Sequence, residues 1–182
     1  MNFVELCGKL NAKRERDINY VSLARSMARS FAENFRKSID APNWYKITDE
    51  KSREQSLRYI DIVPSDAEGN DIVQGQWTDT DMRFDSEGFF LFSLVVTLEY
   101  APESYPKIKF KIPCGVRPIN KDECAVFIGI RDDKTFYKEF LWQKKGPLQG
   151  NGPEQYAYSI LIEYLDSTPY ENNSKIKGIG FI

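Results

Sequence analysis

The sequence predicts an α+β domain: an N-terminal helix, an antiparallel β-meander of five to six strands, and a C-terminal helix packed on one face. Three observations support this class. An apolar repeat with steps of three and four residues comes first, a series of strand-like segments follows, and a second helical repeat lies after a stretch rich in glycine and proline. We therefore expect a single domain over 1–182, with a helical N-terminal region over 1–44 and an α+β core over 57–182.

The two helices are predicted from apolar stripes. The first is expected over residues 18–38, preceded by a shorter helix over 3–10 and followed by a loop over 40–56. The second is expected to begin at Pro153, because proline suits the first turn of a helix, and to end before Pro169. The stripes consist of Tyr20, Leu23, Ala24, Met27, Phe31, Phe35 and Ile39 in the first helix, and Ala157, Ile160, Leu161, Tyr164 and Leu165 in the second.

Alternation of side chains predicts the strands. In the stretch KIKFKI, lysines alternate with apolar residues, so one face is expected to meet water and the other to join the core. The segment FFLFSLVVTLEY is almost wholly apolar, which is typical of a central strand buried on both faces. Strands are expected over 57–63, 71–77, 89–100, 107–112, 124–130 and 135–142, with the tail 175–182 docked as an edge strand.

Composition excludes several classes of enzyme. The chain has no histidine, so histidine-assisted nucleophiles and imidazole-ligated zinc sites are impossible. No phosphate loop, dinucleotide fingerprint or serine-centred elbow is present, and no cofactor is expected. Three cysteines without a CxxC pair indicate a reducing compartment, and neither a signal peptide nor a membrane-spanning stretch is evident. We therefore expect a cytoplasmic protein with no membrane contact.

Charge is distributed in blocks along the chain. The net charge is −2, but residues 1–40 and 105–149 are basic on balance, whereas 41–104 and 150–182 are acidic. Such blocks can form faces of opposite sign that steer a partner. The candidate binding residues are Lys107, Lys109 and Lys111 on a basic face, and Asp79, Asp81, Asp85 and Glu87 in an acidic cluster.

A resemblance to ubiquitin-conjugating enzymes covers residues 89–173. The family shows a long strand, a turn ending in Tyr-Pro, a second strand, a His-Pro-Asn loop, the catalytic cysteine, a tryptophan and a late helix. This chain has FSLVVTLEYAPESYP, KIKFKI, RPIN, DEC, LWQ and YAYSILIEYLDSTPYENN in the same order. The resemblance implies the α+β scaffold and would place Cys124 at the cysteine position. It also fits an inactive relative, such as the RWD-type interaction domains that share the scaffold.

The hypothesis favoured by the sequence is a non-catalytic protein-binding module that acts through its charged faces. Bacterial or phage-encoded inhibitors of a nuclease or another defence enzyme are stand-alone domains of this kind. Nucleic acid is a further possible partner of the lysine face, although a pI of about 5.4 disfavours a dedicated nucleic-acid binder. The alternatives are an enzyme using Cys124 for conjugation, and a metal-dependent nuclease using Asp61, Asp71 and the acidic cluster.

Overall fold

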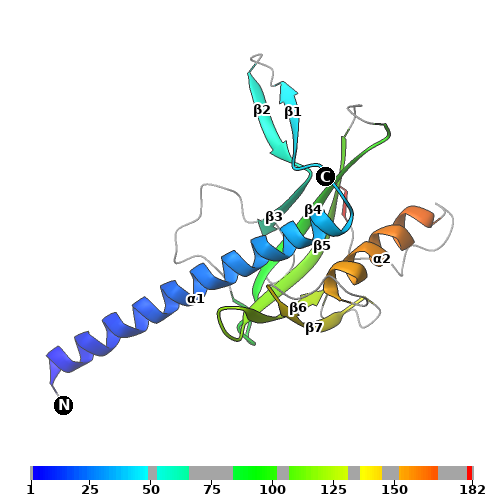
Figure 1. Ribbon diagram of the computed structural model, residues 1–182. Coiled ribbons are helices and arrows are strands. Elements are labelled where there is room, and N and C mark those ends of the chain that lie inside the picture. The colour runs from blue at the N-terminus through cyan, green and yellow to red at the C-terminus, as the bar shows by residue number, and fades with distance from the viewer. Residues whose placement is uncertain are drawn as a thin grey trace.

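A computed structural model describes residues 2–48, 53–65, 84–101, 107–130, 136–144, 152–167 and 180–181 (Figure 1). Two helices and eight strands occur in this part of the chain. The order of elements is α1 (Phe3–Ser38), β1 (Trp44–Thr48), β2 (Glu54–Arg58), β3 (Ile60–Pro64), β4 (Phe90–Glu99), β5 (Lys107–Pro118), β6 (Glu123–Ile128), β7 (Lys138–Gln143), α2 (Pro153–Asp166) and β8 (Gly180–Phe181).

The main sheet is an antiparallel meander in the order β3-β4-β5-β6-β7. The predicted α+β class and the five-stranded meander are confirmed. β5 is longer than β6, and beyond the end of β6 it pairs with β8 through Phe110 and Lys111. The tail therefore contributes a short antiparallel segment at residues 180–181, whereas the rest of the predicted tail strand lies outside the described residues.

The core lies between one face of the sheet and the two helices. Even-numbered residues of β4 and β5 point toward α1 and α2, as the period of a strand requires. Phe31 of α1 meets Phe92 of β4 and Trp142 of β7 edge to face, with ring centroids 6.4 and 6.3 Å apart. Further core residues include Met27, Phe35, Leu94, Phe110, Ile112, Val116, Val126, Ile128, Ala157, Ile160 and Leu161.

The opposite face of the sheet holds a smaller apolar cluster built around Phe89, Leu91 and Phe127. Gly115 makes this cluster possible, because a Cβ on that residue would lie 2.1 Å from the Phe127 ring. β4 is consequently buried on both faces over most of its length, as its apolar sequence predicts.

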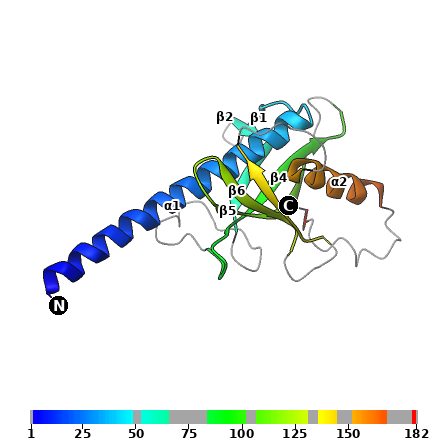
Figure 2. The ribbon, with the colours of Figure 1, turned by 60° about the horizontal axis from the view of Figure 1, so that its bottom comes forward.

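The N-terminal region differs from the prediction of two separate helices. α1 is one continuous helix from Phe3 to Ser38, and its first half extends away from the sheet (Figures 1 and 2). Asn2 caps its start, since the Asn2 side chain accepts a hydrogen bond of 3.0 Å from the Val4 N–H. Gly8 does not interrupt the helix, because one glycine costs only about 1 kcal/mol within a long helix.

The expected loop over 40–56 is also wrong, because it contains most of a hairpin. β1 and β2 form a separate two-stranded antiparallel sheet with Trp44 opposite Arg58. The predicted strand 57–63 is accordingly divided at Tyr59 into β2 and β3. At this division the Tyr59 N–H donates to the Asn43 carbonyl at 3.3 Å, and the Tyr59 carbonyl accepts from the Thr97 N–H at 2.8 Å.

The strand expected over 71–77 lies outside the described residues. Within the part of the chain that the structure describes, no helix is long and apolar enough to cross a membrane.

Candidate functional site

The predicted lysine face is placed on β5, on the side of the sheet away from the helices. The alternation itself is confirmed, since Phe110 and Ile112 are buried in the core while Lys109 and Lys111 are half-buried on the other side. Lys107 departs from the prediction of a solvated side chain, because its side chain is only 7% exposed. A basic face made of all three lysines is therefore not present.

Lys107 is covered because it lies in a small polar and aromatic cluster at the base of the β1–β2 hairpin. Its ammonium forms an ion pair with Glu99, whose side chain is 16% exposed. The ammonium also lies 5.1 Å from the Tyr45 ring centroid and 5.5 Å from that of Tyr59. The Tyr59 hydroxyl donates to the other Glu99 oxygen at 2.5 Å. Lys107 thus joins the hairpin to the sheet and is not available to a partner.

The pKa values of this cluster follow from its contacts. Burial alone would lower the pKa of Lys107, but the hydrogen bond and negative charge of Glu99 outweigh it, and the pKa is raised. Burial and the hydrogen bond to Glu99 both raise the pKa of Tyr59. At neutral pH the lysine is charged and the tyrosine is neutral.

The predicted acidic cluster is described only in part, because Asp79 and Asp81 lie outside the described residues, as does Asp71. The Asp85 carboxylate accepts hydrogen bonds from the Glu87 N–H at 2.9 Å and the Phe89 N–H at 2.8 Å. Asp85 therefore shapes the turn that leads into β4. Among the described residues, no group of three or more cysteine, aspartate or glutamate side chains is arranged to hold a metal ion.

The Cys124 thiol is fully buried on the core face of β6. Burial, together with the charge of Glu154, raises its pKa to about 12. Cys114 of β5 is buried too, and burial raises its pKa. A nucleophilic cysteine requires an accessible thiolate, so these surroundings are typical of structural cysteines.

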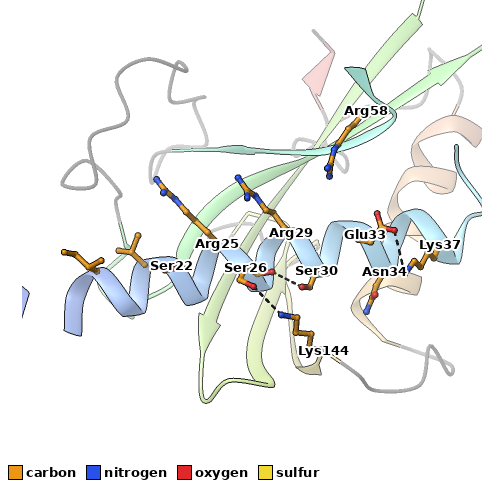
Figure 3. A pocket seen from close by; sticks show the side chains of 12 residues that line it. Ser22, Arg25, Ser26, Arg29, Ser30, Glu33, Asn34, Lys37, Arg58 and Lys144 are labelled. Carbon is orange, nitrogen blue, oxygen red and sulfur yellow. Dashed lines mark hydrogen bonds and ion pairs between the residues drawn. The ribbon is translucent and has the colours of Figure 1, made fainter. Parts of the chain in front are cut away.

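A groove beside α1 is lined by charged and small polar side chains (Figure 3). It has a volume of about 980 Å³ and follows the outer side of the helix, away from the core. Arg58 at the end of β2 lines it on one side, and Lys144 after β7 approaches α1 from the other. The residues of α1 that line it are Ile18, Val21, Ser22, Arg25, Ser26, Arg29, Ser30, Glu33, Asn34 and Lys37.

Three arginines converge on this groove. Arg25 and Arg29 are one helical turn apart and point to the same side of α1, and Arg58 at the end of β2 points back toward the helix (Figure 3). The guanidinium of Arg58 lies over the Trp44 ring, 4.9 Å from its centroid. This stacking orients Arg58 without neutralising its charge.

The carboxylate in the groove, Glu33, is neutralised by neighbours on its own helix. Arg36 donates two hydrogen bonds to it, at 2.8 and 3.1 Å, and Lys37 lies 3.7 Å away. The hydrogen bond from Arg36 is the main reason that the pKa of Glu33 is lowered. Glu33 is therefore ionised at neutral pH, and Arg36 balances its charge directly.

Small polar side chains give the groove its depth. Ser22, Ser26 and Ser30 recur every four residues and so form a row along the outside of α1. The Ser30 hydroxyl donates to the Ser26 carbonyl at 2.9 Å, and Lys144 donates to the Ser26 hydroxyl at 3.3 Å. Large side chains in this row would fill the space between the arginines and Lys144.

Sequence reasoning missed this groove. Arg25 and Arg29 lie off the apolar stripe, and such arginines usually form a solvated helix face. The signal that could have located the site is the row of serines beside them. The contribution of Arg58 and Lys144, from distant parts of the chain, could not be read from local patterns.

Comparisons of this chain with protein-family models, with curated proteins and with solved structures gave no match. The functional interpretation therefore depends on the geometry of the groove.

Proposed function

We propose that this protein is a non-catalytic binding module that captures an acidic segment of a partner protein in the groove beside α1. The observation that carries this proposal is that Arg29 of α1 and Arg58 of β2 line the same groove, in which the Glu33 carboxylate is paired with Arg36. Guanidinium groups bind carboxylates through paired hydrogen bonds, which gives both charge complementarity and geometric selection.

The size and lining of the groove support a peptide segment as its occupant. Its volume of about 980 Å³ lies at the upper end of the range for ligand sites, roughly 300–1,000 Å³. The arginines and the row of serines along α1 suit a segment that carries aspartate or glutamate. If that segment belongs to a nuclease or another defence enzyme, the module would act as its inhibitor.

The alternatives with catalysis have less support. The Cys124 thiol is buried and protonated at neutral pH, which disfavours a conjugating enzyme. Asp61 lies on an exposed part of β3, where its side chain accepts the Ile62 N–H at 2.9 Å, and no metal-binding group forms around it among the described residues.

The proposal can be tested by fluorescence anisotropy with a short labelled peptide rich in glutamate. A second peptide with glutamine in place of glutamate measures the contribution of charge. We expect Arg29→Gln and Arg58→Gln each to weaken binding of the acidic peptide by about 10-fold or more, since a charge-assisted hydrogen bond contributes about 1.5–3 kcal/mol. Lys121→Gln is the matched control, because Lys121 is exposed in the β5–β6 turn, away from the groove.

Two outcomes would contradict the proposal. Equal affinity for the glutamate and glutamine peptides would show that charge does not direct binding. Tighter binding of a single-stranded oligonucleotide than of the acidic peptide, with loss of that binding in the same arginine variants, would reassign the groove to nucleic acid.

A further inference from the structure

The apolar stripe that packs α1 on the sheet continues into the half of the helix that extends away from it. Residues at alternating steps of four and three share one side of the helix, which is the pattern of a coiled-coil seam. Along the second half, Ala24, Ala28, Phe31 and Phe35 of this series are fully buried. Along the first half, the same series runs through Phe3, Cys7, Leu10, Arg14, Asp17 and Val21.

The first half of α1, residues 3–21, is called the arm below. Every residue from 2 to 19 except Cys7 is exposed. Single exposed apolar side chains are ordinary on a protein surface, but several on one side of a helix indicate an interaction site. The exposed fractions are 79% for Phe3, 71% for Val4, 54% for Leu6, 67% for Leu10 and 46% for Ile18.

Local interactions alone give the arm little stability. Ion pairs join Lys9 to Glu5 at 2.9 Å and Lys13 to Asp17 at 2.5 Å, both spaced four residues apart. Each such pair contributes only about 0.3–0.5 kcal/mol when exposed. Helices of this length are marginal in water unless an apolar face is packed against something.

We propose that the arms of two copies of this chain pair as antiparallel helices, with the two-fold axis near residue 12. In this register Phe3 lies opposite Val21 of the second copy, and Leu10 lies opposite Arg14 of the second copy. Val4 and Ile18 meet on one flank of the seam. The five exposed apolar side chains of the arm all face the interface or its edges.

The charges in the seam select the antiparallel orientation. A parallel pair would place Arg14 against Arg14 and Asp17 against Asp17, and both contacts bring like charges together in a partly desolvated seam. The antiparallel pair instead places Arg14 against Leu10 and Asp17 against Cys7. A long arginine side chain can cover an apolar neighbour with its methylenes while its guanidinium stays in water.

The area available fits a reversible dimer. At their observed exposures, the five apolar side chains of two arms together present on the order of 1,000 Å² of surface, and the polar flanks add to it. Specific complexes bury about 1,200–2,000 Å² in total, so the arms reach the lower end of that range. We therefore expect a dissociation constant in the micromolar range.

Sedimentation equilibrium of the full chain between about 1 and 200 µM tests the association. We expect a transition from monomer to dimer, which Leu10→Glu shifts at least 10-fold toward monomer. Leu141→Glu is the matched control, because Leu141 on β7 is 68% exposed, almost the same as Leu10. A chain that stays monomeric throughout this range overturns the proposal, as does an equal effect of the two substitutions.

Cross-linking tests the register. In a Cys7→Ser background, a mixture of Leu10→Cys and Arg14→Cys chains is expected to form disulfide-linked dimers, because the antiparallel pair places residues 10 and 14 in one layer. Neither variant alone is expected to cross-link. Disulfide-linked dimers of the Leu10→Cys chain alone, or of the unaltered chain through Cys7, would show a parallel pair and overturn the register.

Discussion

The ion pair between Lys107 and Glu99 predicts a large loss of stability on replacing the lysine. The Lys107 side chain is 7% exposed and that of Glu99 is 16% exposed, so water cannot readily replace the missing ammonium. Removing one partner of a covered ion pair costs about 3–5 kcal/mol. We expect Lys107→Met to lower the free energy of unfolding by about 3 kcal/mol. This value is at the lower end of the range because the Tyr59 hydroxyl still donates a hydrogen bond to Glu99 in the variant.

Urea unfolding followed by tryptophan fluorescence measures this loss. Lys109→Met is the matched control, because Lys109 lies on the same strand and the same side of the sheet but outside the cluster. We expect it to stay within about 0.5 kcal/mol of the unaltered chain.

The cause of the loss can be separated by a second substitution. If the destabilisation comes from leaving the Glu99 carboxylate covered and unpaired, then Glu99→Leu combined with Lys107→Met should be more stable than Lys107→Met alone. A stability of Lys107→Met within about 0.5 kcal/mol of the unaltered chain would refute the reasoning. So would strictly additive effects of the two substitutions.

Two further predictions concern the sheet. Because burial raises the pKa of Cys124 from 9.0 to about 12, the unfolded chain loses this proton first. The contribution of Cys124 to stability is therefore complete below pH 9 and falls by about 1.4 kcal/mol per pH unit between pH 9 and 12. In urea titrations at alkaline pH, the free energy of unfolding of Cys124→Ala should fall less steeply with pH than that of the unaltered chain. An identical fall would contradict this assignment. At Gly129, where φ is +102° and a Cβ would lie 1.9 Å from the Phe136 carbonyl oxygen, alanine should cost about 3 kcal/mol or more; an unchanged melting temperature would contradict this expectation.

The main elements of the fold could be predicted because they follow strong periodic patterns. The alternation in KIKFKI fixed which side chains of β5 enter the core, and the continuous apolar run of β4 indicated burial on both faces. The β1–β2 hairpin was missed because its sequence is rich in charged and polar residues. Its cross-strand contacts explain why it still forms, since Lys46 pairs with Glu54 at 3.1 Å and Arg58 stacks on Trp44.

The candidate site could not be predicted from the sequence to the same extent. The exposure of Lys107 was predicted wrongly because the alternation of side chains shows only on which face of the sheet a residue lies. It does not show whether another part of the chain packs on that face. Tyr45 and Tyr59 belong to a hairpin that the sequence did not reveal, and their rings cover the ammonium. The groove likewise requires Arg58 and Lys144, which only tertiary structure brings to α1.

The continuity of α1 has a consequence for avidity. One straight element carries both the arm and the arginine groove, so pairing of the arms would fix the spacing between two grooves. With the axis near residue 12 and the grooves centred near residue 27, that spacing is about 45 Å at 1.5 Å per residue. A target with two acidic segments at this spacing would bind both grooves at once. After the first segment binds, the effective concentration of the second segment at the other groove depends on the distance between the grooves.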